Sequence, residues 1–266
     1  MNGRSIFVVG GGPSLSGFDF RPLSRKNTIV VNSSIFFVPN PDYFITMDFT
    51  WFGKNGIQYD SLGEGNKKTY RLSKAKKFFV VAYDKGRFVH TPNGVLDTRF
   101  DLNYDLRVVD EVIHSTSYGG VGKSLQDFHC GSDSGYSGIQ LAVALGYTKI
   151  YLLGMDFDIT SSDNRTPNPT TISSSEVSLL RSPGSRTTRV SKISIRKDSH
   201  FFKKMNPFEL KNFKKKLDEY LIPYPSLFKE ISEKTPSQIF SCSSSSRLNR
   251  YIDYIPFSKA IKDDRC

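Results

Sequence analysis

A glycine-rich loop near the start of the chain has the residue types of a ligand-binding turn. Ile6 to Val9 are apolar, and Gly10 to Gly12, Pro13 and Ser14 follow directly. An uninterrupted apolar run predicts a strand buried on both faces, as in a parallel sheet. Glycines let the backbone turn sharply and approach a ligand closely, and ligands of open α/β sheets bind at the carboxyl ends of the strands. The loop is therefore a candidate binding site. A structural turn without a ligand is the alternative, and the spacing is not that of the G-x-G-x-x-G dinucleotide motif.

A second candidate lies in the segment from Gly131 to Asp158. Apolar residues at a period near 3.6 predict a helix with Ser134 as its N-cap and Gly146 as its C-terminal stop. The run Lys149 to Leu153 predicts a buried strand directly after it. This is a helix-to-strand unit of a doubly wound sheet, in which Ser134 stands where the helix dipole and backbone N–H groups favour a phosphate.

Two carboxylates, Asp156 and Asp158, come just beyond the carboxyl end of this strand. Because a D-x-D pair binds a divalent metal in many glycosyltransferases, the pair is an alternative metal site. The cysteines Cys130, Cys242 and Cys266 are odd in number, and no two are spaced like zinc ligands. The sequence therefore predicts neither a disulfide framework nor a structural metal.

The other elements must place these loops at one edge of a sheet. Runs of β-branched and aromatic residues predict further strands, while Ile57 to Gly65 and Lys85 to Asn103 show no clear period. A capping box starting at Asn206 predicts a helix that ends at Pro223. The predicted strands are Thr28 to Val31, Asp42 to Thr46, Phe78 to Ala82, Arg107 to Ile113 and Gln238 to Ser241.

The net charge of +11 is concentrated in one part of the chain. Residues 164–216 carry 13 Lys and Arg against three acidic residues. Such a region attracts phosphate, an acidic sugar, an anionic membrane or nucleic acid, or is simply a solvated face. The overlapping segment of residues 159–199 is rich in Ser, Thr, Pro and Arg, which is typical of a lid or long loop.

The chain of 266 residues is long enough to bury a full core. We expect a single Rossmann-like α/β domain spanning residues 1–266, with a mostly parallel, doubly wound sheet and a basic lid at about 159–199. No apolar run reaches the length of a transmembrane helix. The N-terminus has too short an apolar core for a secretory signal, so we expect a cytoplasmic protein.

Three pieces of the chain, in this order, carry a resemblance to a known family. They are VVGGGPSL, SGYSGIQLAVALGYTKIYLLGMDFD, and a His followed by a helix and a Ser-rich turn. This combination resembles the bacterial sialyltransferases of glycosyltransferase family 42. It equally resembles a broader set of MptE-like proteins of bacteria and phages, which includes 6-hydroxymethylpterin diphosphokinases.

The resemblance implies a nucleotide site. In the sialyltransferases, the glycine loop and an Asn after the second strand hold the cytidine monophosphate of CMP-sialic acid, and catalysis is metal-independent. The Ser-Gly pair that opens the central helix and the Asp after the next strand also have counterparts here. The matching positions are Gly10, Gly11, Gly12, Ser14, Asn32, Ser134, Gly135 and Asp156.

The resemblance also implies a catalytic base at His200, which follows the lid. The acceptor hydroxyl must lose its proton as it attacks the anomeric carbon, and an imidazole titrates near working pH. The sialyltransferases use lid tyrosines on the departing phosphate, but no Tyr occurs between Tyr151 and Tyr220. Lid serines or the arginines 181, 186 and 189 are the replacements that the sequence offers.

The sequence thus predicts a glycosyltransferase that binds a nucleotide sugar, such as CMP-sialic acid, and transfers the sugar to an acceptor hydroxyl without a cofactor. One alternative is a diphosphokinase that uses ATP and Mg²⁺, with Asp156 or Asp158 on the metal. Another is a nucleic-acid-directed or non-catalytic nucleotide-binding module whose basic segment grips nucleic acid. Neither the acceptor nor the oligomeric state follows from the sequence.

Overall fold

The computed structural model of the 266-residue chain describes residues 4–48, 51, 63–82, 88–91, 94–98, 102–104, 106–158 and 215–263. The expected lid, the basic lid arginines and His200 lie outside these ranges. So does the capping box expected at Asn206, although residues 215–221 are helical as predicted.

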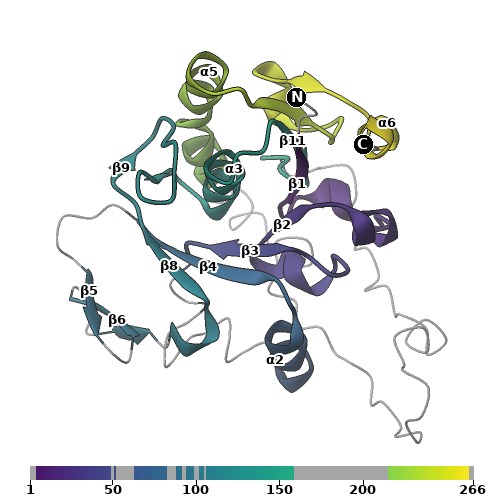
Figure 1. The fold of residues 1–266 in the computed structure, drawn as a ribbon. Coiled ribbons are helices and arrows are strands. Elements are labelled where there is room, and N and C mark those ends of the chain that lie inside the picture. Colours follow the sequence, from purple (N-terminus) through teal and green to yellow (C-terminus); the bar gives the residue numbers. More distant parts are fainter. Residues whose placement is uncertain are drawn as a thin grey trace, which may run out of the picture.

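One eight-stranded sheet forms the centre of the described structure (Figure 1). Its order is β13-β12-β11-β1-β2-β3-β4-β8, and each pair of neighbours runs parallel. The strands are β1 (Ser5–Val9), β2 (Thr28–Val31), β3 (Tyr43–Thr46), β4 (Lys76–Val81), β8 (Glu111–His114), β11 (Lys149–Leu153), β12 (Gln238–Ser241) and β13 (Asp253–Tyr254).

The strand order reverses at β1. From β1 the chain proceeds to β2, β3, β4 and β8 on one side, whereas β11, β12 and β13 extend the sheet on the other. Because β1 and β11 are parallel neighbours, the loops that follow them leave the same edge of the sheet side by side. In open α/β sheets, this switch point is where ligands bind.

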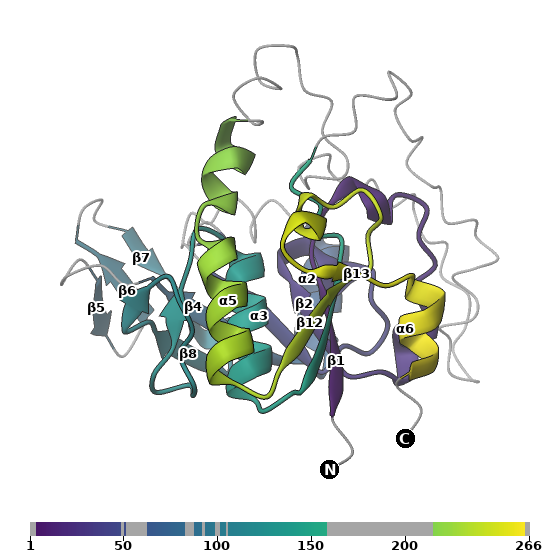
Figure 2. The ribbon, with the colours of Figure 1, turned by 90° about the horizontal axis from the view of Figure 1, so that it is seen from above.

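Helices cover both faces of the sheet, which makes the fold doubly wound and Rossmann-like. Figure 1 shows α3 and α5 on one side of the strands and α2 and α6 on the other. Seen from above in Figure 2, α3 and α5 run side by side along the sheet. The helices are α2 (Gly63–Leu72), α3 (Ser134–Ala144), α5 (Tyr224–Lys234) and α6 (Phe257–Asp263), with the short turns η1 (Pro13–Leu15), η2 (Arg21–Arg25), η3 (Asn32–Phe36), η5 (Leu106–Val108) and η7 (Arg247–Arg250).

Smaller sheets flank the main one. The strands β5 (Phe88–Thr91), β6 (Gly94–Asp97) and β7 (Leu102–Tyr104) form an antiparallel sheet near the β8 edge (Figures 1 and 2). A short parallel pair joins β9 (Ser117–Tyr118) to β10 (His129–Cys130). None of the described helices is both long and apolar enough to cross a membrane.

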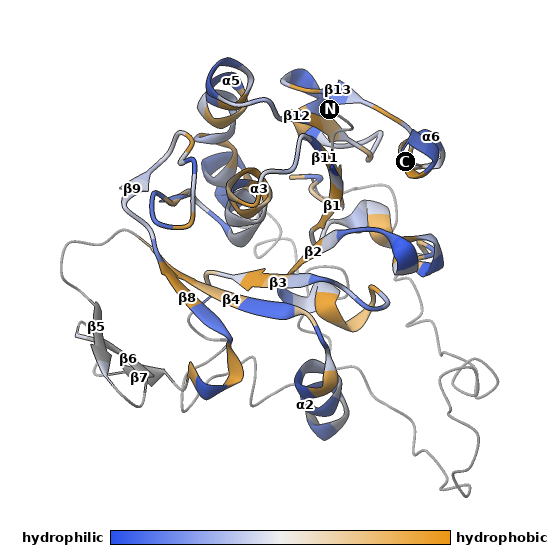
Figure 3. Ribbon diagram, viewed as in Figure 1, coloured by the Kyte–Doolittle hydropathy of each residue, from blue (hydrophilic) through white to orange (hydrophobic). Residues whose placement is uncertain are grey.

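Alternate residues of the central strands build two separate cores. In β1, Ile6 and Val8 face α3 and α5, while Phe7 and Val9 face the opposite layer. This follows from the two-residue period of a strand. In Figure 3 the central strands β1, β2 and β3 are largely hydrophobic, whereas α2 is mostly hydrophilic.

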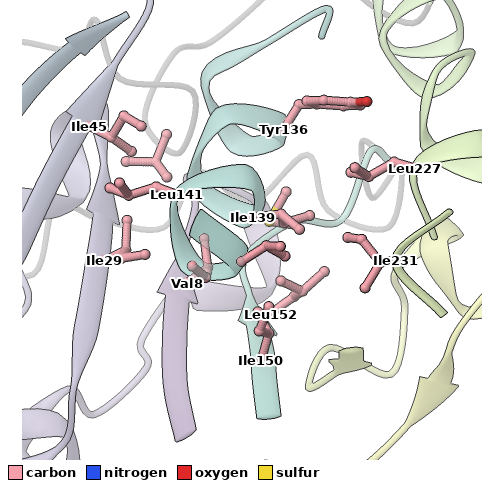
Figure 4. Close-up of a cluster of buried hydrophobic side chains, with 14 of the residues drawn as sticks. Val8, Ile29, Ile45, Tyr136, Ile139, Leu141, Ile150, Leu152, Leu227 and Ile231 are labelled. Atoms are coloured by element: carbon pink, nitrogen blue, oxygen red, sulfur yellow. The ribbon is translucent and has the colours of Figure 1, made fainter. Parts of the chain in front are cut away.

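Helix α3 lies between the sheet and α5 (Figure 4). Its Leu141 points toward Ile29 and Ile45 of the sheet. Leu227 and Ile231 of α5 lie on the opposite side of α3. The helix comes this close because Gly138 has no side chain. A Cβ at Gly138 would lie 2.9 Å from Val8 Cγ1 and 3.1 Å from Val31 Cγ2.

We therefore expect Gly138→Ala to lower the free energy of unfolding by about 1 to 2 kcal/mol, because overpacking outweighs the better helix propensity of alanine. Gly65→Ala in α2 is the matched control, since a Cβ there has no neighbour within 4 Å. It should raise stability by about 0.5 to 1 kcal/mol. Urea unfolding measures both, and a neutral or stabilising Gly138→Ala contradicts the described packing.

The structure confirms most of the predicted strands. The predicted limits agree with β1, β2, β3, β4, β11 and β12 within two residues. The strand expected from Arg107 to Ile113 is wrong in its first half, where η5 takes up Leu106–Val108 and β8 begins only at Glu111. Helices α5 and α6 were not predicted, although Pro223 ends the preceding helix as expected and also caps α5.

Candidate functional site

Backbone hydrogen bonds hold the glycine loop against the loop that follows β11. Gly10 N–H donates to Leu153 O at 2.8 Å, and Gly12 N–H donates to Gly154 O at 2.6 Å. Each glycine is needed for this approach, because a Cβ at either position would lie 2.7 Å from Gly154 O. The structure thus gives Gly10 and Gly12 a packing role between two loops of the protein.

Asp156 fastens the same two loops through its side chain. Its carboxylate accepts from Ser14 N–H at 2.7 Å and from the Ser14 hydroxyl at 2.8 Å. The residue is only 1% exposed. Ser14 Oγ also lies 2.9 Å from Ser243 Oγ, which brings the loop after β12 into the same network. The predicted position of Asp156 just beyond the strand end is confirmed.

This arrangement does not fit a cation at Asp156. Each of its two oxygens accepts a hydrogen bond from Ser14, and the carboxylate is enclosed. Asp158 is exposed beside it. Within the described ranges, no three His, Cys, Asp or Glu side chains gather closely enough to hold one metal ion.

Two polar groups at this sheet edge have no partner among the described residues. The first is Asn32 Oδ1, which is buried at the end of β2 without a hydrogen bond. Asn32 also has a positive φ of 51°, a conformation that non-glycine residues adopt rarely and often at functional sites. The second is Gly11 N–H, for which no acceptor occurs in the described part of the chain, although its neighbours Gly10 and Gly12 both donate.

The cap of α3 is Asp133, so the prediction that Ser134 caps this helix is wrong. Asp133 Oδ1 accepts from Gly135 N–H at 2.7 Å and from Tyr136 N–H at 3.0 Å. Ser134 is buried and its hydroxyl oxygen accepts from Met47 N–H at 2.9 Å, which ties α3 to the end of β3. Aspartate and serine cap equally well, so only the backbone geometry could distinguish the two neighbours.

The Asp133 carboxylate therefore occupies the helix N-terminus where a phosphate was expected. Tyr224 of α5 donates its hydroxyl to both carboxylate oxygens, at 3.0 and 3.1 Å. Burial raises the pKa of Asp133 above its ordinary value, and the hydrogen bond from Tyr136 N–H lowers it in part. The roles of Ser134 and Gly135 in nucleotide binding remain predictions.

We expect Asp133→Ala to lower the free energy of unfolding by about 1 to 2 kcal/mol through loss of the cap, and Asp133→Asn to retain most of the stability that the cap contributes.

Because the folded-state pKa of Asp133 is raised, the folded protein binds more protons than the unfolded chain above the ordinary aspartate pKa, and wild-type stability falls as pH rises. Asp133→Asn removes this titration. Its stability relative to wild type should therefore rise with pH in urea unfolding, and a difference independent of pH contradicts the raised pKa.

The loop after β12 contributes residues that the sequence analysis did not single out. Ser243 and Ser246 are buried, and Ser246 Oγ donates to Met155 O at 2.7 Å. Arg247 N–H donates to Asp156 O at 2.9 Å. Only a Ser-rich composition marked this loop in the sequence, and no local pattern indicates that it packs beside Asp156.

The predicted site residues thus divide into two groups. The structure brings the glycine loop, Asn32, Ser134, Gly135 and Asp156 together at the carboxyl ends of β1, β2 and β11 and the start of α3. His200 lies outside the described residues, and its role as the base stays a prediction.

Comparisons with known proteins give structural similarity at low sequence identity. No protein-family model and no curated protein matches the chain. The chain is similar to the MAf glycosyltransferase from Magnetospirillum magneticum AMB-1, with 14% identity and a TM-score of 0.45, over 96% of this chain and 34% of that one. It is also similar to the sialyltransferase CST-II in complex with a trisaccharide acceptor and CMP, with 16% identity and a TM-score of 0.41, over 95% of this chain and 86% of that one.

A third structure is the sialyltransferase CstII from Campylobacter jejuni with the substrate analogue CMP-3FNeuAc, with 15% identity and a TM-score of 0.39. The chain covers 95% of its own length in this match and 86% of the sialyltransferase. At such identities the comparisons assign no role to any single residue.

Proposed function

We propose that this chain is a glycosyltransferase that binds a nucleotide sugar at the switch point beside β1 and transfers the sugar to an acceptor hydroxyl. The observation that carries nucleotide binding is the pair of unpartnered groups at this edge, Gly11 N–H and Asn32 Oδ1. One is a donor and one is an acceptor, and both lie where α/β sheets bind ligands.

A buried acceptor without a hydrogen-bond partner destabilises the folded protein, because it has lost its hydrogen bond to water and formed none within the protein. A ligand that donates to Asn32 Oδ1, through an exocyclic amine of a base or a ribose hydroxyl, removes this cost. The positive φ of Asn32 also supports a ligand at this position. Strained backbone is often retained at functional sites, and the Oδ1 atom of this residue has no hydrogen-bond partner among the described residues.

The class of reaction rests on the sequence motifs. Their resemblance to the family 42 sialyltransferases supports sugar transfer, with CMP-sialic acid as the first donor to test. In that reaction the acceptor oxygen bonds to the anomeric carbon, the nucleotide leaves with the electrons of the broken C–O bond, and His200 accepts the hydroxyl proton. No metal is required by this scheme.

The diphosphokinase alternative needs Mg²⁺ and ATP. Its strongest candidate ligand, Asp156, is enclosed and accepts a hydrogen bond from Ser14 on each carboxylate oxygen, so the geometry does not favour the diphosphokinase. The nucleic-acid alternative depends on the basic segment, most of which lies outside the described residues, and no described contact favours it.

The direct test is release of free nucleotide from CMP-sialic acid, UDP-sugars and GDP-sugars, with and without glycan acceptors. We expect one donor to release its nucleotide and to form a glycosidic product in the presence of EDTA. Formation of AMP from ATP and Mg²⁺ with a pterin alcohol, and no release from any nucleotide sugar, contradicts the proposal.

A further inference from the structure

We propose that Arg247 binds the phosphate of the nucleotide at this site and replaces the lid tyrosines that the sequence lacks. This inference rests on the proposed function, because it assumes that a nucleotide occupies the switch point. Arg247 is the first residue of η7, directly after the Ser-rich loop that follows β12.

The position of Arg247 is fixed by the β11 loop on which the site is built. Its N–H donates to Asp156 O at 2.9 Å, and its Nη1 donates to Phe157 O at 3.2 Å. Asp156 in turn binds Ser14 of the glycine loop. The guanidinium is therefore directed from β12 back toward β11, and so toward the switch point, rather than toward the outer strand β13.

Only one nitrogen of the Arg247 guanidinium, Nη1, has partners among the described residues. Nη1 forms an ion pair with Asp218 Oδ1 at 2.7 Å, in addition to its bond to Phe157 O. Nε and Nη2 have no partner among the described residues. The Arg247 side chain is 29% exposed, so these donors are half-buried at the sheet edge. A planar fork of N–H donors in this state is suited to phosphate oxygens, which it binds in a bidentate manner.

A strained residue holds this arrangement. Phe157, between the two aspartates of the D-x-D sequence, has a positive φ of 51°. Its ring packs edge-on against Tyr224 at a centroid distance of 4.9 Å, and its carbonyl turns to Arg247. A bulky side chain in this conformation is costly unless the surroundings enforce it, and such strain concentrates at functional sites.

The competing explanation is that Arg247, through its ion pair with Asp218, only joins the helix at residues 215–221 to the β11 loop. The Asp218 side chain is 64% exposed, and an ion pair with so exposed a partner contributes little. A phosphate is therefore able to share the guanidinium with Asp218 or to displace it. Asp218→Asn removes the ion pair and leaves the guanidinium, which separates the two explanations.

The test compares nucleoside monophosphates with their nucleosides, using CMP, UMP, GMP and AMP with cytidine, uridine, guanosine and adenosine. Isothermal titration measures each pair on wild type, Arg247→Gln, Arg247→Lys and Asp218→Asn. We expect Arg247→Gln to weaken the monophosphate that wild type binds by about 10- to 100-fold and to leave its nucleoside unchanged, because only the charge-assisted bond is lost. Arg247→Lys should be intermediate, since it keeps the charge without the fork.

Asp218→Asn should bind the monophosphate at least as tightly as wild type. Equal monophosphate affinity in wild type and a folded Arg247→Gln overturns the inference and leaves the proposed function intact. Parallel losses for monophosphate and nucleoside, or an equal loss in Asp218→Asn, assign Arg247 to holding the loops and also overturn it. Absence of any nucleotide binding to wild type overturns the proposed function itself. Unfolding midpoints without ligand verify that each variant is folded.

Discussion

Replacing His200 by alanine is expected to lower the rate of sugar transfer by about two to four orders of magnitude, the usual contribution of a positioned general base. Nucleotide affinity should change little, because the groups proposed to hold the nucleotide lie at the ends of β1, β2 and β12. The measurement is turnover with the donor identified by nucleotide release, together with titration of its nucleotide.

His114→Ala is the matched control. His114 ends β8, four strands from β1 in the sheet, and is exposed. Its replacement should leave turnover within a few-fold of wild type. If His200→Ala also stays within a few-fold, His200 is not the base. A loss of binding in parallel with turnover indicates a structural role instead.

Asp156→Ala is expected to have the largest effect on the site itself. It removes a buried carboxylate that accepts two hydrogen bonds from Ser14, leaving a backbone N–H and a hydroxyl without this partner. Hydrogen bonds to charged groups contribute strongly and their loss is costly, so we expect the free energy of unfolding to fall by roughly 2 to 4 kcal/mol. The glycine loop and the β11 loop should separate, and nucleotide binding should be lost.

A double-mutant cycle tests this account of Asp156 by urea unfolding. Ser14→Ala alone should destabilise the protein, but should cost much less in the Asp156→Ala background, because the hydroxyl has already lost its carboxylate. Asp156→Asn keeps the shape and one acceptor and should lie between wild type and Asp156→Ala. Additive effects of Ser14→Ala and Asp156→Ala contradict a shared interaction.

The main elements follow from local patterns in the sequence. Ile6 to Val9 and Ile150 to Leu153 are hydrophobic throughout because both faces of these strands are covered, and Gly146 adopts the positive φ expected at a helix end. Helix α5 was missed because Pro223 was interpreted only as the end of one helix, whereas its backbone is also compatible with the start of the next. The strand expected at Arg107 began late because η5 uses its first residues.

The site was predictable in position but not in its contacts. The glycine loop, Asn32 and Asp156 were predicted as site residues because each follows the carboxyl end of a predicted strand, and the carboxyl ends of parallel strands lie at one edge of the sheet. The pairing of Asp156 with Ser14 spans 142 residues in sequence, and the position of Arg247 depends on how η7 packs on the β11 loop. Such contacts arise from tertiary packing, so no local pattern reveals them.

Nucleotide-dependent thermal stabilisation of Asn32→Gly tests the central claim most directly. Glycine accepts the positive φ without strain and removes only the side chain. Asn40→Gly is the control, because Asn40 has a φ of 50° but is exposed in the loop before β3. The panel is CMP, CMP-sialic acid, UDP-sugars, GDP-sugars and ATP with Mg²⁺, since a ligand that binds only the folded state raises its midpoint. We predict that one nucleotide or nucleotide sugar raises the midpoint of wild type and Asn40→Gly, and that this rise is largely lost in a folded Asn32→Gly. An equal rise in all three proteins, or no rise with any ligand of the panel, would contradict a nucleotide site at this edge of the sheet.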